Sequence, residues 1–239
     1  MLPDVMPDGG PVRFVHVDDA VLVLDKPAGL LSVPGRGPHK QDCLSARVQA
    51  RYADALVVHR LDMATSGLIV IARSAMVQRA LSRAFEHRLV RKRYVAIVSG
   101  HLDAADGEWQ TIDLPIGVDW PNRPRRVIDL QNGQPSTTRF RVMHADPLNN
   151  TTRVELEPVT GRTHQLRVHL LAIGHPILGD MLYGPAEAAA RSPRLLLHAC
   201  ALAFAHPHDG EMLQLASPAD FWRPTVPQDH EAARPLPCA

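Results

Sequence analysis

A single carboxylate stands in a polar turn at residues 59–67, which read HRLDMATSG. Asp62 is the only acid of this turn, which runs through Gly67 into the apolar stretch 68–72. A loop at the edge of a strand can fix one reactive group rigidly, because the flanking strand and the helix that Ser74 opens hold it in place. Asp62 is therefore a candidate catalytic residue. The alternative is that an Asp before Thr-Ser-Gly caps its own turn through side-chain to backbone hydrogen bonds.

Other kinds of reactive site are disfavoured by the sequence. His164 and His169 are five residues apart, which puts them on different faces of a helix rather than together on a metal ion. The cysteines are widely spaced, which argues for reduced thiols in a cytoplasm and against a zinc site: Cys43, Cys200 and Cys238. Neither a Gly-rich phosphate loop nor a nucleophile elbow is present, so we expect no metal and no cofactor.

The composition is ordinary, but the charge is unevenly distributed. A chain of 239 residues with 45% hydrophobic and 21% charged residues can bury a large core. The start lacks the features of a signal peptide, and no apolar run reaches the roughly 18 residues of a membrane span. We therefore expect a cytoplasmic protein. The formal net charge is only +1, yet basic residues gather at 79–93 and 123–126. Such patches suit a polyanion, although a charged run can also be a solvated helix face.

Hydrophobic periodicity predicts a mixed, mostly antiparallel sheet flanked by a few helices, which is an α+β fold. Alternating or β-branched segments predict strands at 12–17, 20–24, 68–72, 93–99, 137–143, 151–157, 194–205 and 212–215. Asp42, Ser74 and Thr163 are the predicted N-caps of three helices, the last running to about residue 173. Residues 107–133 read as irregular, and Trp120 lies in a Pro-rich, basic loop that we expect to project and grip a ligand.

Several motifs together resemble one protein family. HRLDMATSG looks like the HRLDxxTSG signature of the RluA family of pseudouridine synthases, KRYVA at 92–96 resembles its KxYxA strand, and GRTHQLR at 161–167 resembles the start of one of its helices. Further matches are DKPAGL at 25–30, GHPILGD at 174–180 and LLLHA at 195–199. The motifs follow the family's order over most of the chain.

The resemblance implies a domain organisation. The catalytic domain is expected at residues 12–223, between an N-terminal tail at 1–11 and a C-terminal tail at 224–239. Because the catalytic strands begin by about Val12, we expect no separate S4 RNA-binding domain before them.

The resemblance also implies a reaction, the isomerisation of uridine in RNA to pseudouridine without a cofactor. Asp62 matches the family's catalytic aspartate. Its chemical step is attack at C1′, removal of the C2′ proton to give a glycal, or attack at uracil C6. The sequence does not choose among these three routes.

Four more residues receive roles from the resemblance. Arg162 matches the family's arginine partner and would hold Asp62 ionised through a charge-assisted bond. Tyr94 would stack on the detached uracil and help to deprotonate C5. Leu166 would close the pocket against water, and Arg60 would fill the space that the target base leaves when it flips out.

The resemblance implies an RNA partner and no membrane, and we expect the chain to act as a monomer. Segments at 31–36 and 120–124 are similar to the dual-specificity type of the family, which acts on 23S rRNA and on tRNA. The residues expected to hold RNA are Arg88, Arg91, Lys92, Arg93, Asn122 and Arg123.

Two other functions compete with this interpretation. A noncatalytic RNA-binding module of the same fold predicts the loss of Asp62, Tyr94 or Arg162, and all three residues are present. A glycosidic-bond hydrolase normally needs a second carboxylate to activate water. The matched motifs offer only Asp180 for that task, so isomerisation is the better interpretation.

Overall fold

The computed structural model describes residues 11–102 and 107–221, whose strands form one large twisted sheet and a small separate one. The strands of the N-terminal half and the centre are β1 (Arg13–Val17), β2 (Val21–Lys26), β3 (Leu56–Val57), β4 (Ser66–Ala72), β11 (Leu197–Ala205) and β12 (Met212–Ala216). The second half contains β5 (Arg91–Ser99), β6 (Gln110–Asp113), β9 (Thr137–Asp146) and β10 (Thr151–Pro158). The small sheet pairs β7 (Ile116–Val118) with β8 (Arg126–Ile128). The helices are α1 (Leu44–Gln49), α2 (Ala75–Glu86), α3 (Gln165–Ala172) and α4 (Ala186–Ala190), with a 3-10 turn, η1, at Pro38–Lys40.

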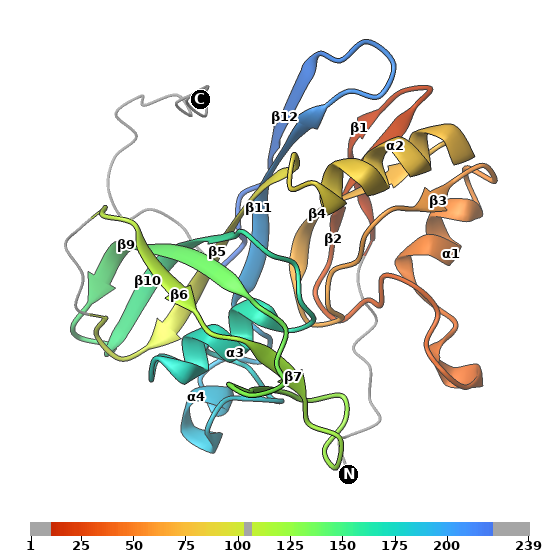
Figure 1. The fold of residues 1–239 in the computed structure, drawn as a ribbon. Helices are drawn as coiled ribbons and strands as arrows, with labels where there is room; N and C mark the ends of the chain where they lie inside the picture. The colour runs from red at the N-terminus through yellow and green to blue at the C-terminus, as the bar shows by residue number, and fades with distance from the viewer. Residues whose placement is uncertain (1–10, 103–106, 222–239) are drawn as a thin grey trace.

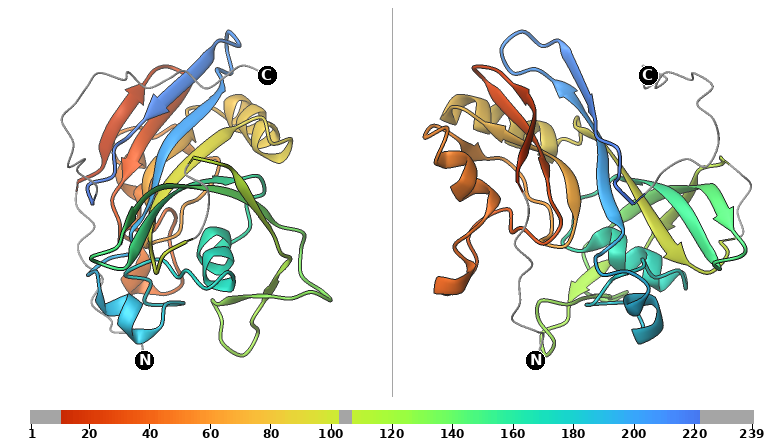
Figure 2. Two further views of the ribbon diagram at one scale, coloured as in Figure 1. Left: turned by 90° about the vertical axis from the view of Figure 1, so that its left-hand side faces the viewer. Right: turned by 180° about the vertical axis from the view of Figure 1, so that it is seen from behind.

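The large sheet joins two halves through its central strand. Its order is β1-β2-β4-β11-β5-β10-β9-β6, with β12 also paired to β11 and β3 to β4. Within it only the β4–β11 pair is parallel. Figures 1 and 2 show β11 running between the half that carries α1 and α2 and the half that carries α3. The prediction of a mixed, mostly antiparallel α+β fold is therefore confirmed.

Strand β4 is buried on both faces, which explains its continuous apolar run. Leu68 and Val70 lie in one core cluster with the buried face of α2, while Ile69 and Ile71 lie in another with α1. Side chains alternate between the two faces of a strand, so a strand covered on both sides needs apolar residues at every position. The Asp62 turn thus leads into one of the most completely buried segments of the molecule.

Gly67 allows β4 and β11 to approach at the centre of the sheet. Its backbone has a φ of +111°, and a Cβ added there would lie 2.3 Å from the carbonyl oxygen of Ala199. Only glycine accepts that conformation and that distance. The Gly of the Thr-Ser-Gly motif therefore fixes the parallel junction beside which the Asp62 turn sits.

The second half of the sheet has one apolar and one charged face. Leu166 and Leu170 of α3 pack on residues of β5, β9 and β10 such as Ala96. On the other face, the guanidinium groups of Arg93, Arg139 and Arg141 lie 4.4 to 5.1 Å from the centre of the Trp109 ring. This face is built of stacked and ion-paired side chains rather than apolar core.

Two predicted helix starts are wrong, and one is confirmed. Ser74 caps α2, since its hydroxyl accepts a hydrogen bond from the Val77 N–H at 3.2 Å. Asp42 instead pairs with Arg47, and α1 begins at Leu44, whose N–H donates to the carbonyl of Leu31 at 2.7 Å. At the third start the residue before the helix is His164 rather than Thr163.

The stretch predicted to be irregular contains three short strands. β6 extends the large sheet, and β7 and β8 form a hairpin whose turn carries Trp120, 67% exposed. The projecting loop was thus placed correctly, but its flanking strands were missed because they are only three or four residues long. The predicted domain limit at 12 lies within the described residues. The limit at 223, residues 1–10 of the predicted N-terminal tail and the whole predicted C-terminal tail at 224–239 lie outside them.

Candidate active site

The carboxylate of Asp62 faces the start of α3 rather than its own turn. That turn is closed by the backbone, where the Thr65 N–H donates to the Asp62 carbonyl at 3.1 Å. The Asp62 side chain is 27% exposed, and its two oxygens face Arg167 and His164. The turn-cap interpretation of this aspartate therefore does not describe its carboxylate.

Arg167 holds one oxygen of Asp62 and is itself held by a buried acid. Its Nη1 lies 3.7 Å from Asp62 Oδ2, while its Nε and Nη2 donate to the two oxygens of Asp180 at 2.8 and 2.6 Å. Burial alone would lower the pKa of Arg167, but its hydrogen bonds to Asp180 and that residue's charge raise the pKa above its ordinary value. The guanidinium is a permanent cation that Asp180 orients toward Asp62.

Arg162 does not take the place predicted for it beside Asp62. Its side chain is exposed, and its Nε lies 3.4 Å from the carbonyl of Pro135. The Arg162 N–H instead donates to the side chain of Gln165 at 3.0 Å, which fixes the turn before α3. The arginine that reaches Asp62 is five residues later, on the first turn of the helix.

Tyr94 and Leu166 form an apolar wall next to the carboxylate. Tyr94 lies on β5 and packs against the cluster that contains Leu166, and Ala64 of the Asp62 turn packs there too. Burial raises the pKa of the Tyr94 hydroxyl well above its ordinary value, and the charge of Asp62 adds to the effect. At neutral pH the side chain beside Asp62 is therefore an uncharged phenol.

His164 faces the other oxygen of Asp62. Its Nε2 lies 3.9 Å from Asp62 Oδ1, and its Nδ1 lies 2.7 Å from the hydroxyl of Tyr183. Burial lowers the pKa of His164, although the charge of Asp62 opposes the change. A neutral imidazole therefore lies opposite a carboxylate.

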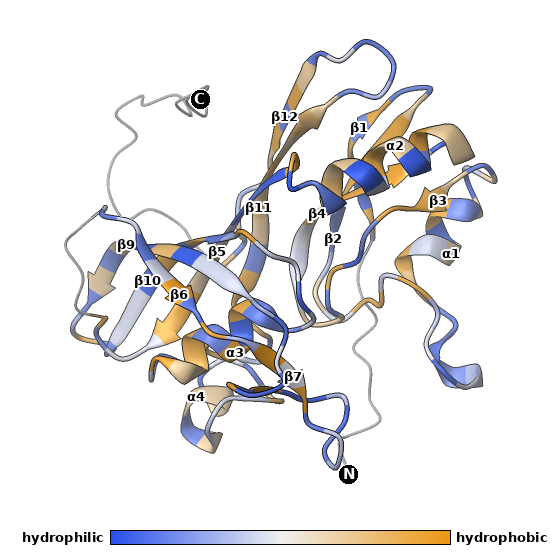
Figure 3. Ribbon diagram, viewed as in Figure 1, coloured by the Kyte–Doolittle hydropathy of each residue, from blue (hydrophilic) through white to orange (hydrophobic). Residues whose placement is uncertain are grey.

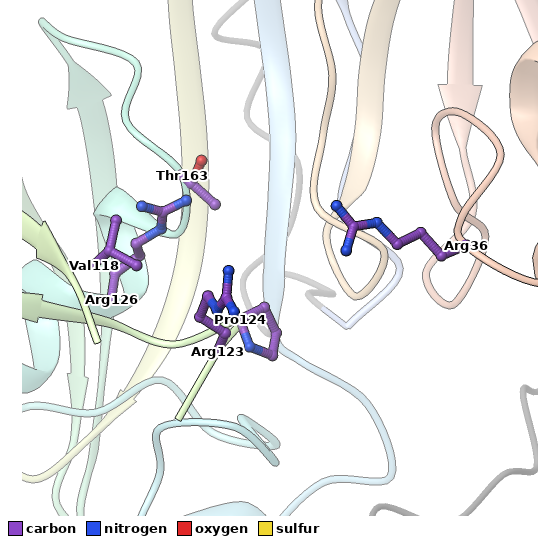
Figure 4. Close-up of a pocket in the computed structure, with 6 residues that line it drawn as sticks. All are labelled: Arg36, Val118, Arg123, Pro124, Arg126 and Thr163. Atoms are coloured by element: carbon purple, nitrogen blue, oxygen red, sulfur yellow. The ribbon is translucent and has the colours of Figure 1, made fainter. Parts of the chain in front are cut away.

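A basic cleft of about 470 Å³ borders this arrangement. Figure 4 shows the Arg36 side chain on one rim, opposite Arg123 and Arg126 on the other. The two rims are the loop before α1 and the turn of the β7–β8 hairpin, and both are hydrophilic in Figure 3. Thr163, next to His164, also lines the cleft, so the cleft reaches the segment that faces Asp62.

Comparison with known proteins assigns the fold and the motifs together. The model of a family described as RNA pseudouridylate synthase matches residues 20–172, which include the Asp62 turn, β5 and α3. This chain belongs to the RNA pseudouridylate synthase family. Human RNA Pseudouridylate Synthase Domain Containing 1 has a similar structure, with a TM-score of 0.74 and 29% identity, over 93% of this chain and 88% of that one.

Curated relatives are similar over nearly their whole length. The synthase is 50% identical over 208 residues to a protein of Pasteurella multocida (strain Pm70), and 49% identical over 208 residues to one of Escherichia coli (strain K12). Both are named Dual-specificity RNA pseudouridine synthase RluA, and each match covers 87% of this chain and 93% of the relative. The resemblance stated from the motifs is confirmed, and so is the predicted isomerase activity on RNA.

Two further observations concern metal binding and membrane spanning by the described residues. Within residues 11–102 and 107–221, no group of three or more His, Cys, Asp or Glu side chains is placed to hold a metal ion. No helix in the same ranges is long and apolar enough to cross a membrane.

The predicted RNA-binding residues of the synthase do not share one surface. Arg88 and Arg91 are exposed, and Lys92 Nζ would lie 3.9 Å from a Cβ at Gly161, near the start of α3. Arg93 points to the opposite face of β5, where it pairs with a glutamate and stacks on Trp109. Neighbouring residues of a strand face opposite ways, so Arg93 cannot share a surface with Tyr94.

The loop residues predicted to hold RNA lie on the rim of the cleft or beside it. Asn122 is exposed and donates to Asp119 at 3.0 Å, which shapes the hairpin turn. Arg123 is exposed, lines the cleft and lies 4.9 Å from the centre of the Trp120 ring. Arg36 faces it from the other rim and was missed because nothing in the sequence links segments so far apart.

Lys26 is a further residue of the synthase's site that sequence reasoning left without a role. It is completely buried, and its Nζ lies 2.8 to 3.1 Å from the carbonyl oxygens of Pro27, Leu30 and Met63, within hydrogen-bond distance of each. Met63 follows Asp62, so this lysine ties the Asp62 turn to the end of β2. Burial lowers the pKa of Lys26 to about 7, although the negative charge of Asp62 raises it in part.

This pKa predicts how the stability of the synthase depends on pH. The ordinary pKa of the group is 10.5, so between about pH 7 and 10 the unfolded chain binds a proton that the folded chain lacks. Stability from this site therefore rises with pH. The free energy of unfolding of the wild type, minus that of Lys26→Met, should increase by about 1 kcal/mol per pH unit from pH 7 to 9. Urea unfolding measures it, and a constant or falling difference would contradict the assignment.

Proposed function

We propose that this synthase isomerises a uridine in compact stem-loops of 23S rRNA and tRNA, with Asp62 as the catalytic carboxylate. The supporting observation is the position of that carboxylate. It is partly exposed between Arg167 and His164, next to a cleft whose rims carry guanidinium groups. The relatives named dual-specificity synthases support the choice of two kinds of RNA.

The ion pair with Arg167 suits each of the three chemical routes. Attack at C1′, attack at C6 and removal of the C2′ proton all need an ionised carboxylate in a site that the bound RNA closes. A guanidinium 3.7 Å away attracts this carboxylate and orients it, and Asp180 keeps the guanidinium in place.

Tyr94 supports the reaction as a neutral stacking group. The phenol keeps its proton because burial and the Asp62 charge raise its pKa. This favours stacking on the detached uracil over removal of the C5 proton, because a neutral phenol is a poor base. With Leu166 packed in the same cluster, the ring keeps water from the sugar intermediate.

The target uridine has to leave its base stack to reach Asp62. Arg60 is exposed two residues before Asp62, a position from which it can enter the space that the base leaves. The cleft rims would meanwhile hold the phosphates on both sides of the flipped nucleotide, which positions the RNA without reading its sequence.

Hydrolysis of the glycosidic bond is a poorer interpretation of the same geometry. Asp180 is 1% exposed, and both of its oxygens accept hydrogen bonds from Arg167. A carboxylate so engaged cannot activate water for attack on a sugar. The second acid that a hydrolase needs is thus occupied in holding the arginine.

The substrate proposal predicts activity on isolated hairpins. RNA of this kind is recognised through loops whose bases can splay out, so a tRNA anticodon stem-loop and a similarly folded 23S rRNA hairpin should both react without ribosomes. Release of tritium from uridine labelled at C5 measures the reaction. Activity confined to assembled ribosomal particles would refute this choice of substrate while leaving the chemistry intact.

The same hairpins test the cleft as the RNA contact. The double variant Arg36→Gln and Arg123→Gln should reduce the slope of log affinity against log salt by roughly 1.5, since each phosphate contact contributes about 0.7 to 0.9. The matched control is Arg79→Gln with Arg83→Gln, which removes equal charge from exposed positions on α2. A smaller salt slope in the control, with an unchanged slope in the Arg36 and Arg123 variant, would show that the RNA phosphates contact α2 rather than the cleft.

A further inference from the structure

His164 has a backbone conformation that few residues other than glycine adopt. Its φ is +58°, in the left-handed region, and it immediately precedes α3. A non-glycine residue keeps such a conformation only where its surroundings fix it, and functional sites are common places for it. Here the conformation puts the ring between two groups, with Nε2 toward Asp62 and Nδ1 toward Tyr183.

The Tyr183 hydroxyl accepts one hydrogen bond and has one proton of its own to donate. It is a buried side chain, 7% exposed, and its oxygen accepts a hydrogen bond from the Arg126 N–H at 2.8 Å. A buried hydroxyl needs an acceptor for its own proton. His164 Nδ1, at 2.7 Å, is the acceptor that the structure offers.

The direction of this hydrogen bond determines the tautomer of the imidazole. Burial keeps the pKa of His164 below its ordinary value, so the neutral ring carries a single proton at neutral pH. If Nδ1 accepts the tyrosine proton, the ring proton must be on Nε2. That nitrogen is the one that faces Asp62 Oδ1.

We propose that Tyr183 is a positioning residue, which fixes His164 as the Nε2–H tautomer so that this N–H is the second donor to the Asp62 carboxylate. The inference rests on the proposed role of Asp62. The separation of 3.9 Å is longer than a hydrogen bond in the RNA-free protein, and such contacts in active sites commonly tighten when substrate binds. Arg167 on Oδ2 and His164 on Oδ1 then hold the carboxylate plane in one orientation.

The proposal also connects the RNA cleft to the carboxylate. Arg126 begins β8, and its side chain lines the cleft while its N–H binds Tyr183. Arg125, next to it, donates from Nε to the Leu182 carbonyl at 2.9 Å, which ties the same hairpin to the residue before Tyr183. The hairpin that grips RNA thus supports the donor at Asp62 through two side chains.

Nitrogen NMR of the full-length, RNA-free protein tests the tautomer directly. The wild type should show His164 with a protonated Nε2 and a bare Nδ1, and the His164→Gln spectrum assigns the signals by their absence. Tyr183→Phe keeps the ring over Arg167 but removes the hydroxyl, so it should give a mixture of both tautomers. A wild type with its proton on Nδ1, or an unchanged tautomer in Tyr183→Phe, would overturn the proposal.

Kinetic measurements distinguish whether His164 donates a hydrogen bond to Asp62 or only shapes the turn before α3. Gln at position 164 can place its amide nitrogen near the Nε2 position, whereas Asn tolerates a positive φ but stops short of Asp62. We expect His164→Gln to retain about tenfold more single-turnover activity than His164→Asn, with equal RNA affinity. The opposite ranking would show that only the backbone matters and would overturn the donor role. The NMR result does not depend on turnover. It therefore tests the tautomer even if the Asp62→Asn variant shows that Asp62 is not the catalytic carboxylate.

Discussion

Replacing Asp62 with Asn is expected to abolish isomerisation and leave RNA affinity nearly unchanged. In the proposed mechanism the carboxylate performs the chemistry and the basic rims of the cleft supply RNA binding, and the variant keeps those rims. We expect single-turnover tritium release to fall by about 1000-fold or more, because a neutral amide can neither attack carbon nor accept a proton. Filter binding of the same hairpin gives the affinity. Turnover within about tenfold of the wild type would show that Asp62 is not the catalytic carboxylate.

Arg167→Lys is expected to be almost as damaging. One guanidinium reaches three oxygens, two on Asp180 and one on Asp62, and a single ammonium group cannot reproduce this planar arrangement. Lysine keeps the buried charge opposite Asp180, so the fold should survive. We expect turnover to fall by about 100-fold or more, with a much smaller loss of RNA affinity.

Arg162→Lys is the matched control for that variant. Both arginines belong to the GRTHQLR motif, but Arg162 is exposed and Arg167 is buried. The control should keep nearly all of its turnover. If Arg162→Lys instead lost turnover while Arg167→Lys kept it, the result would support the pairing of Arg162 with Asp62 that the sequence predicted.

The two arginines show where sequence reasoning reached its limit. The motif offered Arg162 and Arg167, five residues apart, and a helix beginning at Thr163 leaves the first on the loop that feeds it. The structure starts the helix later, after a left-handed His164, and turns Arg167 inward. A long charged side chain is buried only with a partner, and Asp180, thirteen residues later, was not identifiable as that partner from spacing.

Other features were accessible from local patterns. The continuous apolar run after Gly67 predicted a strand, and Ser74 predicted the start of α2, because both depend only on neighbouring residues. The position of Arg93 could have been predicted from the sequence, because side chains alternate along a strand and Arg93 therefore lies on the other face from Tyr94. The cleft between Arg36 and the hairpin arginines could not be foreseen, because tertiary folding alone brings those two loops together.

Nucleoside analysis after complete digestion of a treated hairpin tests the central claim most directly. With the wild-type synthase, uridine at the target should be replaced by an equal amount of pseudouridine, an isomer of identical mass, and no free uracil should appear. With Asp62→Asn, the uridine should stay unchanged. Free uracil with the wild type, or pseudouridine formed at comparable rates by both proteins, would contradict an isomerase that works through the Asp62 carboxylate.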